Sequence, residues 1–144
     1  MGLKVELKPG ERLILGECLI TNSDQRTRLL IEGNSAILRE KDIMTAAAAD
    51  TPAKRLYFIV QLMYTARNPS IHHETYFVLM RDLLRAAPSA WKYLAAISSH
   101  ILAGEMYKAL KSAKGLSAYE KELLSRATRG TNSRPDRSAS NKSA

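Results

Sequence analysis

Residues 3–10 read LKVELKPG, and this stretch decides the character of the first third of the chain. Apolar and charged side chains alternate with a period of two as far as Lys8, which is the pattern of a strand with one buried face. Pro9-Gly10 then indicates a tight turn. The stretch therefore predicts that the chain opens with antiparallel β structure rather than with a helix.

Four more short strands are expected after the first. They are the apolar runs at residues 12–15, 18–21, 27–31 and 36–38, which turn residues separate. Gly33-Asn34 has the chemistry of a hairpin turn, because both residues tolerate positive φ. Cys18, the only cysteine, lies in one of these runs and is expected to be a small buried hydrophobe. Residues 1–44 thus predict a small antiparallel sheet or barrel, whose thin core needs a partner surface.

The sequence becomes helical after a short linker at residues 45–50. Thr51-Pro52 is an N-cap followed by a proline at the first helical position, and apolar residues then recur at helical spacing to residue 127. Breaks are expected at Asn68-Pro69, Pro88, Gly104 and Gly115, which gives five helices. The fourth is expected to run only from Met106 to Ala113. The fold class is therefore α+β, with a small N-terminal antiparallel β-sheet or barrel followed by a C-terminal helical bundle.

Residues 128–144 are rich in Ser, Arg, Asn and Thr and contain hardly any large apolar side chain, so we expect a disordered basic tail. The formal charge is +8, and it is unevenly distributed. Residues 1–50 hold 7 Lys and Arg against 8 Asp and Glu, whereas residues 51–127 hold 11 against 5. A basic excess of this kind favours polyanions such as nucleic acid, although it also serves solubility alone.

Signals for catalysis, metal binding and membranes are weak. The glycines form no phosphate-binding motif, and one cysteine cannot make a zinc site. His72, His73 and Glu74 are adjacent, so on a helix they diverge and cannot chelate one ion in the way a pair at i, i+4 does. We therefore expect no enzyme activity, no metal and no cofactor. The chain shows neither a signal peptide nor an apolar run of about 20 residues, so we expect a cytoplasmic protein that does not enter a membrane.

Several longer segments carry a family resemblance. In the first third they are LKVELKPGER (residues 3–12), ITNSDQRTR (20–28) and ILREKDI (37–43). In the helical part they are ADTPAKR (49–55), VQLMY (60–64), HETY (73–76) and APS (87–89). Over about residues 3–125 the chain resembles the FlbT family of flagellum biosynthesis repressors. The resemblance implies a regulator that binds the 5′ untranslated region of flagellin mRNA, represses translation and promotes decay of the message. Some relatives instead favour flagellin production, and a small companion protein, FlaF, works with or against them.

Residues 3–43 are also similar to the CsrA family of RNA-binding regulators. The similarity lies in GERLILG (10–16), in the β run with Arg28, and in Arg39-Glu40 ahead of Ile43. It implies a small interwoven β dimer that binds leader RNA through basic residues, with Arg39 as the carried-over contact. The basic residues expected on the sheet are Arg39, Arg28, Arg26, Lys4 and Lys8. Lys4 and Lys8 are expected to share one strand face, as are Arg26 and Arg28.

The charge distribution favours a different surface. Electrostatics alone places RNA on the helical half, and the candidate contacts there are Lys54, Arg55, Arg81, Arg85 and Lys92. Residues 1–50 contain no Phe, Trp or Tyr, so the sheet offers no aromatic platform for stacking a base. A second reading remains open. The helical half could instead dock a protein such as flagellin or FlaF, and the effect on flagellin expression would then be indirect.

Overall fold

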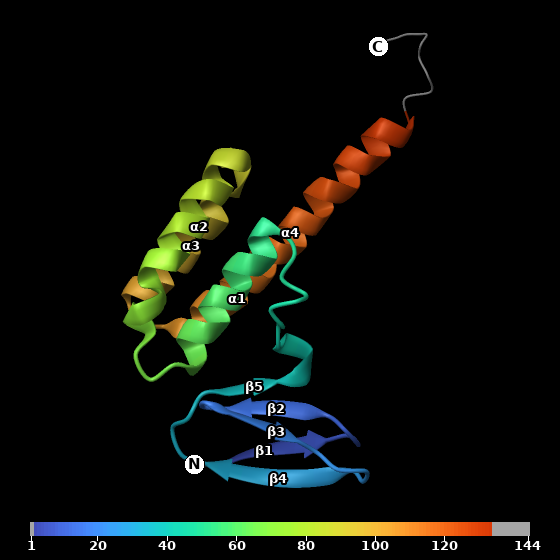
Figure 1. The fold of residues 1–144 in the computed structure, drawn as a ribbon, viewed down its shortest axis with the longest axis vertical. Helices are drawn as coiled ribbons and strands as arrows, with labels where there is room; N and C mark the ends of the chain where they lie inside the picture. Colours follow the sequence, from blue (N-terminus) through green and yellow to red (C-terminus); the bar gives the residue numbers. More distant parts are fainter. Residues whose placement is uncertain (1, 134–144) are drawn as a thin grey trace.

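A computed structural model of the chain describes residues 2–133. The N-terminal part consists of five short strands, followed by the 3₁₀ turn η1 (Glu40–Asp42). The strands are β1 (Gly2–Leu7), β2 (Arg12–Leu15), β3 (Cys18–Thr21), β4 (Thr27–Glu32) and β5 (Ile37–Arg39). They lie within a residue or two of the positions expected from the alternating pattern. This β region sits at one end of the helices, and β5 is the strand nearest to them (Figure 1).

The strands form two antiparallel sheets rather than one. β1 pairs with β4 from Gly2 opposite Glu32 to Leu7 opposite Thr27, and β2 lies between β3 and β5 in the second sheet. β4 and β5 are therefore in different sheets, and the hairpin predicted at Gly33-Asn34 is wrong. Gly33 has φ of 129°, so the segment uses glycine's freedom to cross from one sheet to the other.

The core of the β region is small, as expected. Val5, Leu7 and Leu13 are fully buried, and partly buried apolar side chains from the neighbouring strands pack around them. The second sheet also contributes to the larger helical core, because Leu38 is buried there and Ile14 packs against it. The helices thus cover part of the second sheet, whereas the Val5, Leu7 and Leu13 cluster is packed by side chains of the strands alone among the described residues.

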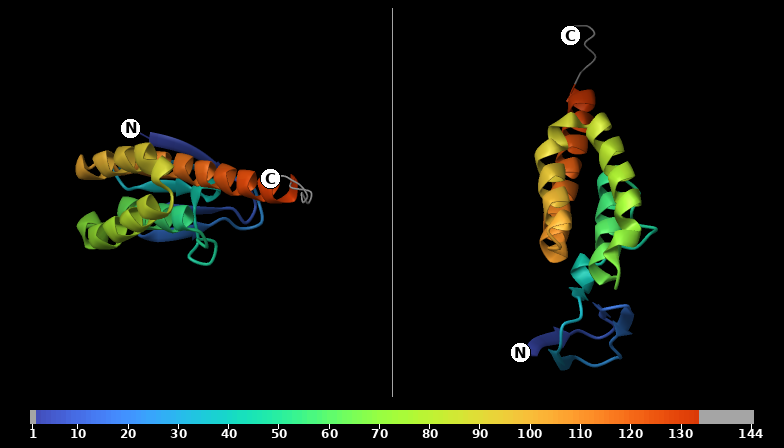
Figure 2. Two further views of the ribbon diagram at one scale, coloured as in Figure 1. Left: turned by 90° about the horizontal axis from the view of Figure 1, so that it is seen from above. Right: turned by 90° about the vertical axis from the view of Figure 1, so that its left-hand side faces the viewer.

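The C-terminal part contains four helices and two further 3₁₀ turns. The helices are α1 (Pro52–Thr65), α2 (His73–Ala86), α3 (Trp91–Leu102) and α4 (Met106–Ser133). The turns are η2 (Pro69–His72) and η3 (Pro88–Ala90). α4 packs against both α1 and α3, and α1 also packs against α2. Seen from above, α1 and α2 form one side of the bundle, and α3 and α4 form the other (Figure 2).

The N-terminus of α1 follows the sequence signal. Thr51 is the N-cap and accepts a hydrogen bond from the Lys54 N–H, and Pro52 occupies the first helical position. Ahead of it, the predicted linker makes a turn in which the Ala48 N–H donates to the Thr45 carbonyl. Gln61 holds the start of this segment against α1, because its side chain bonds both the N–H and the carbonyl of Met44.

Two predicted boundaries near the C-terminus are wrong. α4 runs through Gly115 without a break, so one helix replaces the predicted fourth and fifth. Gly115 lies beside α3, where a Cβ would stand 3.5 Å from the Tyr93 ring, so this glycine marks helix contact rather than a helix end. α4 also continues to Ser133, which makes residues 128–133 helical instead of disordered. The rest of the predicted tail, residues 134–144, lies outside the described residues.

Cys18 also differs from expectation. The thiol is exposed, because β3 is the outer strand of its sheet and most of its side chains face outward. Within residues 2–133, no helix is both long enough and apolar enough to cross a bilayer.

Candidate nucleic-acid interface

Lys4 and Arg28 lie on the outer face of the β1–β4 sheet. In the register, Lys4 is opposite Leu30 and Arg28 is opposite Glu6, and cross-strand partners share a face. All four of these side chains are exposed, whereas Val5 points to the buried side. The two cations therefore occupy one surface, but a carboxylate lies between them.

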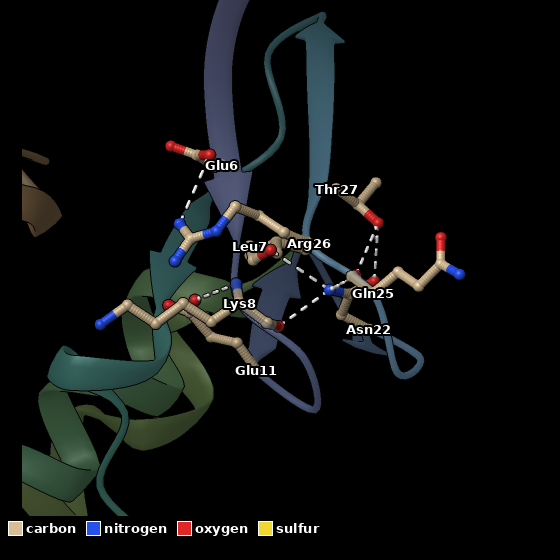
Figure 3. A network of polar contacts seen from close by, with 8 residues as sticks. All are labelled: Glu6, Leu7, Lys8, Glu11, Asn22, Gln25, Arg26 and Thr27. Carbon is tan, nitrogen blue, oxygen red and sulfur yellow. Dashed lines mark hydrogen bonds and ion pairs between the residues drawn. The ribbon is translucent and has the colours of Figure 1, made fainter.

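Arg26 and Lys8 flank this surface without belonging to a strand (Figure 3). Arg26 precedes β4 and bends to pair with Glu6 at 3.4 Å. Lys8 follows β1, and only its backbone enters the polar network: its N–H donates to Glu11 Oε1 at 2.8 Å and its carbonyl accepts from Asn22. Glu6 thus pairs with one of the predicted cations, Arg26, and lies opposite another, Arg28, across the two strands. Its negative charge lowers the positive electrostatic potential of this face.

Arg39 lies elsewhere. It is the last residue of β5 and lines a groove where the β region meets α4, separate from the hollow lined by Lys4 and Arg28. The groove has a volume of about 460 Å³. We call it the basic groove, and we define it by four cations and two aromatic residues of its lining: Arg39, Lys41, Lys111, Lys114, Tyr64 and Tyr107.

Helical spacing places the cations of α4 in the groove. Lys111 and Lys114 are three residues apart and so lie on one face of the helix. Tyr107 lies one turn before Lys111, and the Lys111 ammonium stands 5.5 Å from the centre of its ring. A neighbouring hollow, lined by Lys41, Lys114 and Lys121, extends the positive surface further along α4.

Two contacts hold the sides of the groove together. The Tyr64 hydroxyl accepts a hydrogen bond from the Ile37 N–H at 3.3 Å and donates to the Ile37 carbonyl at 3.0 Å, which fastens the end of α1 to β5. Burial raises the pKa of Tyr64 above its ordinary value, which favours the neutral phenol that donates this hydrogen bond. On the other side, Lys114 pairs with Asp42 at 2.5 Å.

The charge of the groove is strongly positive. Asp42 is the one carboxylate of its lining among the described residues, against four cations. Within residues 2–133, Arg39, Lys41 and Lys111 form no ion pair, and all three side chains are exposed. These three cations are therefore available to an anionic ligand, and they come from both the β region and the helices.

The alternative cations of the helical half do not line the groove. Lys54 and Arg55 lie at the start of α1, Arg81 and Arg85 in the second half of α2, and Lys92 at the start of α3. These segments belong to the part of the bundle away from the β region (Figure 1). Lys54 is also paired with Asp50 at 3.4 Å.

Sequence reasoning missed Lys41, Lys111, Lys114 and Tyr107. A signal existed in residues 107–114, YKALKSAK, where lysines recur every three residues after a tyrosine. Because a helix end was expected at Gly115, these lysines were not recognised as part of one long basic helix face. The proximity of residues 39–41 to α4 is a tertiary contact, which no local pattern indicates.

The histidine cluster offers no metal site. His72 ends η2 and His73 begins α2, and the described residues contain no group of three His, Cys, Asp or Glu that could hold an ion. His73 Nε2 is buried and has no hydrogen-bond partner within residues 2–133. We assign the cluster no chemical role.

Comparisons with known proteins agree with the sequence resemblance. The family model described as "Flagellar protein FlbT" matches residues 3–124. A Bradyrhizobium diazoefficiens protein named probable flagellum biosynthesis repressor protein FlbT 1 is 56% identical over 124 residues, 85% of each chain. A Rhodopseudomonas palustris protein named probable flagellum biosynthesis repressor protein FlbT is 48% identical over 126 residues, which cover 88% of this chain and 100% of the relative.

A more distant relative extends the match. The flagellum biosynthesis repressor protein FlbT of Caulobacter vibrioides is 34% identical over 139 residues, which cover 94% of this chain and 99% of the relative. No solved structure matches the chain. Because the family model and these relatives span nearly the whole described fold, the chain belongs to the FlbT family, whose curated members carry the name flagellum biosynthesis repressor.

Proposed function

We propose that this protein is a post-transcriptional regulator of flagellum biogenesis that binds the 5′ untranslated region of flagellin mRNA through the basic groove. Binding represses translation and promotes degradation of the message. The names of the relatives support the regulatory part of this proposal. The groove supports the RNA part, because it gathers four cations around one carboxylate at the junction of the two halves.

The chemistry of the groove suits a phosphate backbone. Arg39 offers a planar guanidinium that can bind one phosphate through two hydrogen bonds, whereas Lys41 and Lys111 act as point charges. Neutralising phosphates releases condensed counterions, so affinity must fall as salt rises. The outer sheet face is less suitable, because Glu6 pairs with Arg26 and lies opposite Arg28.

A salt titration with purified protein and fluorescently labelled flagellin leader RNA tests the proposal. We expect the logarithm of the association constant to fall by about 0.7 for each log unit of salt and each phosphate neutralised. Arg39→Gln with Lys111→Gln should weaken binding and lower this slope by about 1.4. Neither residue is ion-paired within the described chain, so the fold should persist.

Matched double variants on other surfaces serve as controls. Arg81→Gln with Arg85→Gln removes the same charge from α2, and Lys4→Gln with Arg28→Gln removes it from the sheet face. Both should retain most of the wild-type affinity. Equal losses in all three pairs would mean that only net charge matters, and no binding by the wild type in dilute salt would reject the RNA function.

A protein-docking adaptor is the second candidate. Its support is the exposure of large apolar side chains in the helical half, with Ile71 67%, Trp91 56% and Leu102 72% exposed. Exposed apolar side chains of this size are candidates for a protein contact. Binding to flagellin or FlaF that Trp91→Ser and Leu102→Ser abolish, together with absence of RNA binding, would favour this candidate.

A further inference from the structure

Tyr107 presents a half-exposed aromatic ring at the basic groove. It lies in the first turn of α4, its side chain is 46% exposed, and it lines both the groove and the hollow next to it. The helical half thus supplies the aromatic surface that residues 1–50 lack.

A second tyrosine packs against the Tyr107 ring. Tyr64 packs against Tyr107 with the ring centres 5.6 Å apart and the planes tilted by 46°. Tyr64 in turn is fixed by its two hydrogen bonds to Ile37, one with the N–H and one with the carbonyl. Tyr107 therefore packs against a side chain that is itself hydrogen-bonded to the β region, and this contact restricts the ring in the absence of ligand.

Cations lie near the ring. The Lys111 ammonium lies over the ring, 5.5 Å from its centre, on an exposed side chain that a stacking base would displace, and Arg39 and Lys41 line the same groove. A nucleotide carries a flat apolar base and an anionic phosphate a few ångströms apart. An aromatic face with cations beside it matches both parts at once, which is how proteins hold single strands without reading their sequence.

We propose that Tyr107 stacks on an unpaired base, so that the basic groove selects single-stranded over double-stranded RNA. This inference rests on the proposed function and adds the form of RNA that the groove takes. A duplex keeps its bases stacked on one another, so it can offer phosphates to Arg39 and Lys111 but no free base to Tyr107. An acidic peptide could satisfy the cations but would gain little from the ring.

Two variants distinguish the contribution of the Tyr107 ring to RNA binding from that of its hydroxyl. Tyr107→Phe keeps the aromatic face and should bind single-stranded leader RNA within twofold of wild type. Tyr107→Leu keeps an apolar side chain but loses the aromatic face, and it should bind roughly 5- to 150-fold more weakly. The salt slope should stay the same in both, because no charge is removed. Annealing a complementary strand should reduce wild-type affinity toward that of Tyr107→Leu.

Fluorescence gives a direct second measurement. Tyr107→Trp in a Trp91→Phe background leaves one tryptophan, at the groove, and a stacked base should quench its emission as single-stranded RNA is added. Equal affinity of the Phe and Leu variants, or unchanged emission while RNA binds, would overturn the stacking role but leave the proposed function intact. Loss of polyglutamate binding in Tyr107→Leu with no loss of RNA binding would assign the ring to a peptide ligand. Failure of wild type to bind any RNA would reject both proposals.

Discussion

Thr51 and Glu120, 69 positions apart in the sequence, meet at the N-terminus of α1, where the threonine hydroxyl donates to Glu120 Oε1 at 2.5 Å. The other oxygen of the same carboxylate accepts from the Ala53 N–H at 2.9 Å. Thr51 also caps the helix by accepting from the Lys54 N–H. α4 thus supplies an acceptor for an otherwise unpaired donor of α1, and a negative charge where the helix dipole favours one.

Glu120→Ala should therefore destabilise the protein by about 1–2 kcal/mol, because it leaves the Ala53 N–H unpaired and removes the charge from the helix end. The free energy of unfolding from urea denaturation measures the effect. Glu122→Ala is the matched control on the same helix. Within the described residues, Glu122 pairs with the exposed Arg126 at 3.0 Å, so its loss should cost less than about 0.5 kcal/mol. Equal losses in the two variants would contradict a capping role for Glu120.

Gly115→Ala should stabilise the fold by about 0.5–1 kcal/mol. A glycine inside a helix costs about that much relative to alanine, and the new Cβ would meet the Tyr93 ring at an ordinary contact distance of 3.5 Å. Thermal unfolding followed by circular dichroism checks this. The same change at Gly104, where φ is 78°, should instead destabilise, because the left-handed conformation disfavours a side chain. A lower melting temperature for Gly115→Ala would show that α3 and α4 cannot accept the added methyl group.

These positions show why part of the fold could be predicted from the sequence. The strands and the start of α1 depend on neighbouring residues: alternation in residues 3–8, and the cap and proline at Thr51-Pro52. The wrong predictions arise at glycines whose role depends on residues far away in the sequence. Gly115 reads as a helix end but serves contact with Tyr93, and Gly33-Asn34 reads as a hairpin although Glu32 pairs with Gly2.

The candidate site follows the same rule. Arg39 was predicted from the Arg39-Glu40 motif, because that part of the similarity lies in neighbouring residues, and its contact with RNA stays a prediction. Its neighbours Lys111 and Tyr107 could not be predicted in this way, since about 70 residues separate them from Arg39 in the chain. Local sequence patterns predicted an RNA surface either on the sheet or on the helices. In the folded chain, the basic groove combines Arg39 from β5 with several side chains from α4.

Asn22 organises the turns of the β region, and replacing it should loosen them (Figure 3). Its side-chain amide donates to the carbonyls of Leu7, Lys8 and Gln25, and its oxygen accepts from the Thr27 hydroxyl. Asn22→Ala should cost about 1–3 kcal/mol, because several backbone carbonyls lose their donor together. Hydrogen exchange should show faster opening of β1 and β4. Gln25→Ala, which keeps the backbone carbonyl, should change little, and equal exchange in both variants would contradict this role.

Alkaline pH should destabilise the protein through its buried tyrosines. Burial, and secondarily the charge of Asp42, raises the pKa of Tyr57, and burial also raises the pKa of Tyr76. Because the folded-state pKa is above the unfolded value of 10.0, the stabilisation is complete below pH 10 and is lost as pH rises beyond it. Urea denaturation between pH 8 and pH 11 should show this decline, and Tyr57→Phe should make it shallower. An unchanged decline in Tyr57→Phe would exclude that phenol as a cause.

Asp42→Asn should strengthen RNA binding, in contrast to the losses expected at the cations. Asp42 is the one described carboxylate of the basic groove, and it holds Lys114 in an ion pair at 2.5 Å. Neutralising it removes repulsion of the phosphates and frees the Lys114 ammonium, which should raise affinity roughly two- to fivefold at low salt. The salt slope should increase by up to about 0.7, since one more lysine can neutralise a phosphate. Asp24→Asn, in an exposed turn of the β region, changes net charge equally but frees no lysine of the groove. If both variants gain affinity to the same extent with the same slope, RNA responds to the charge of the whole protein, and the basic groove is not where it binds.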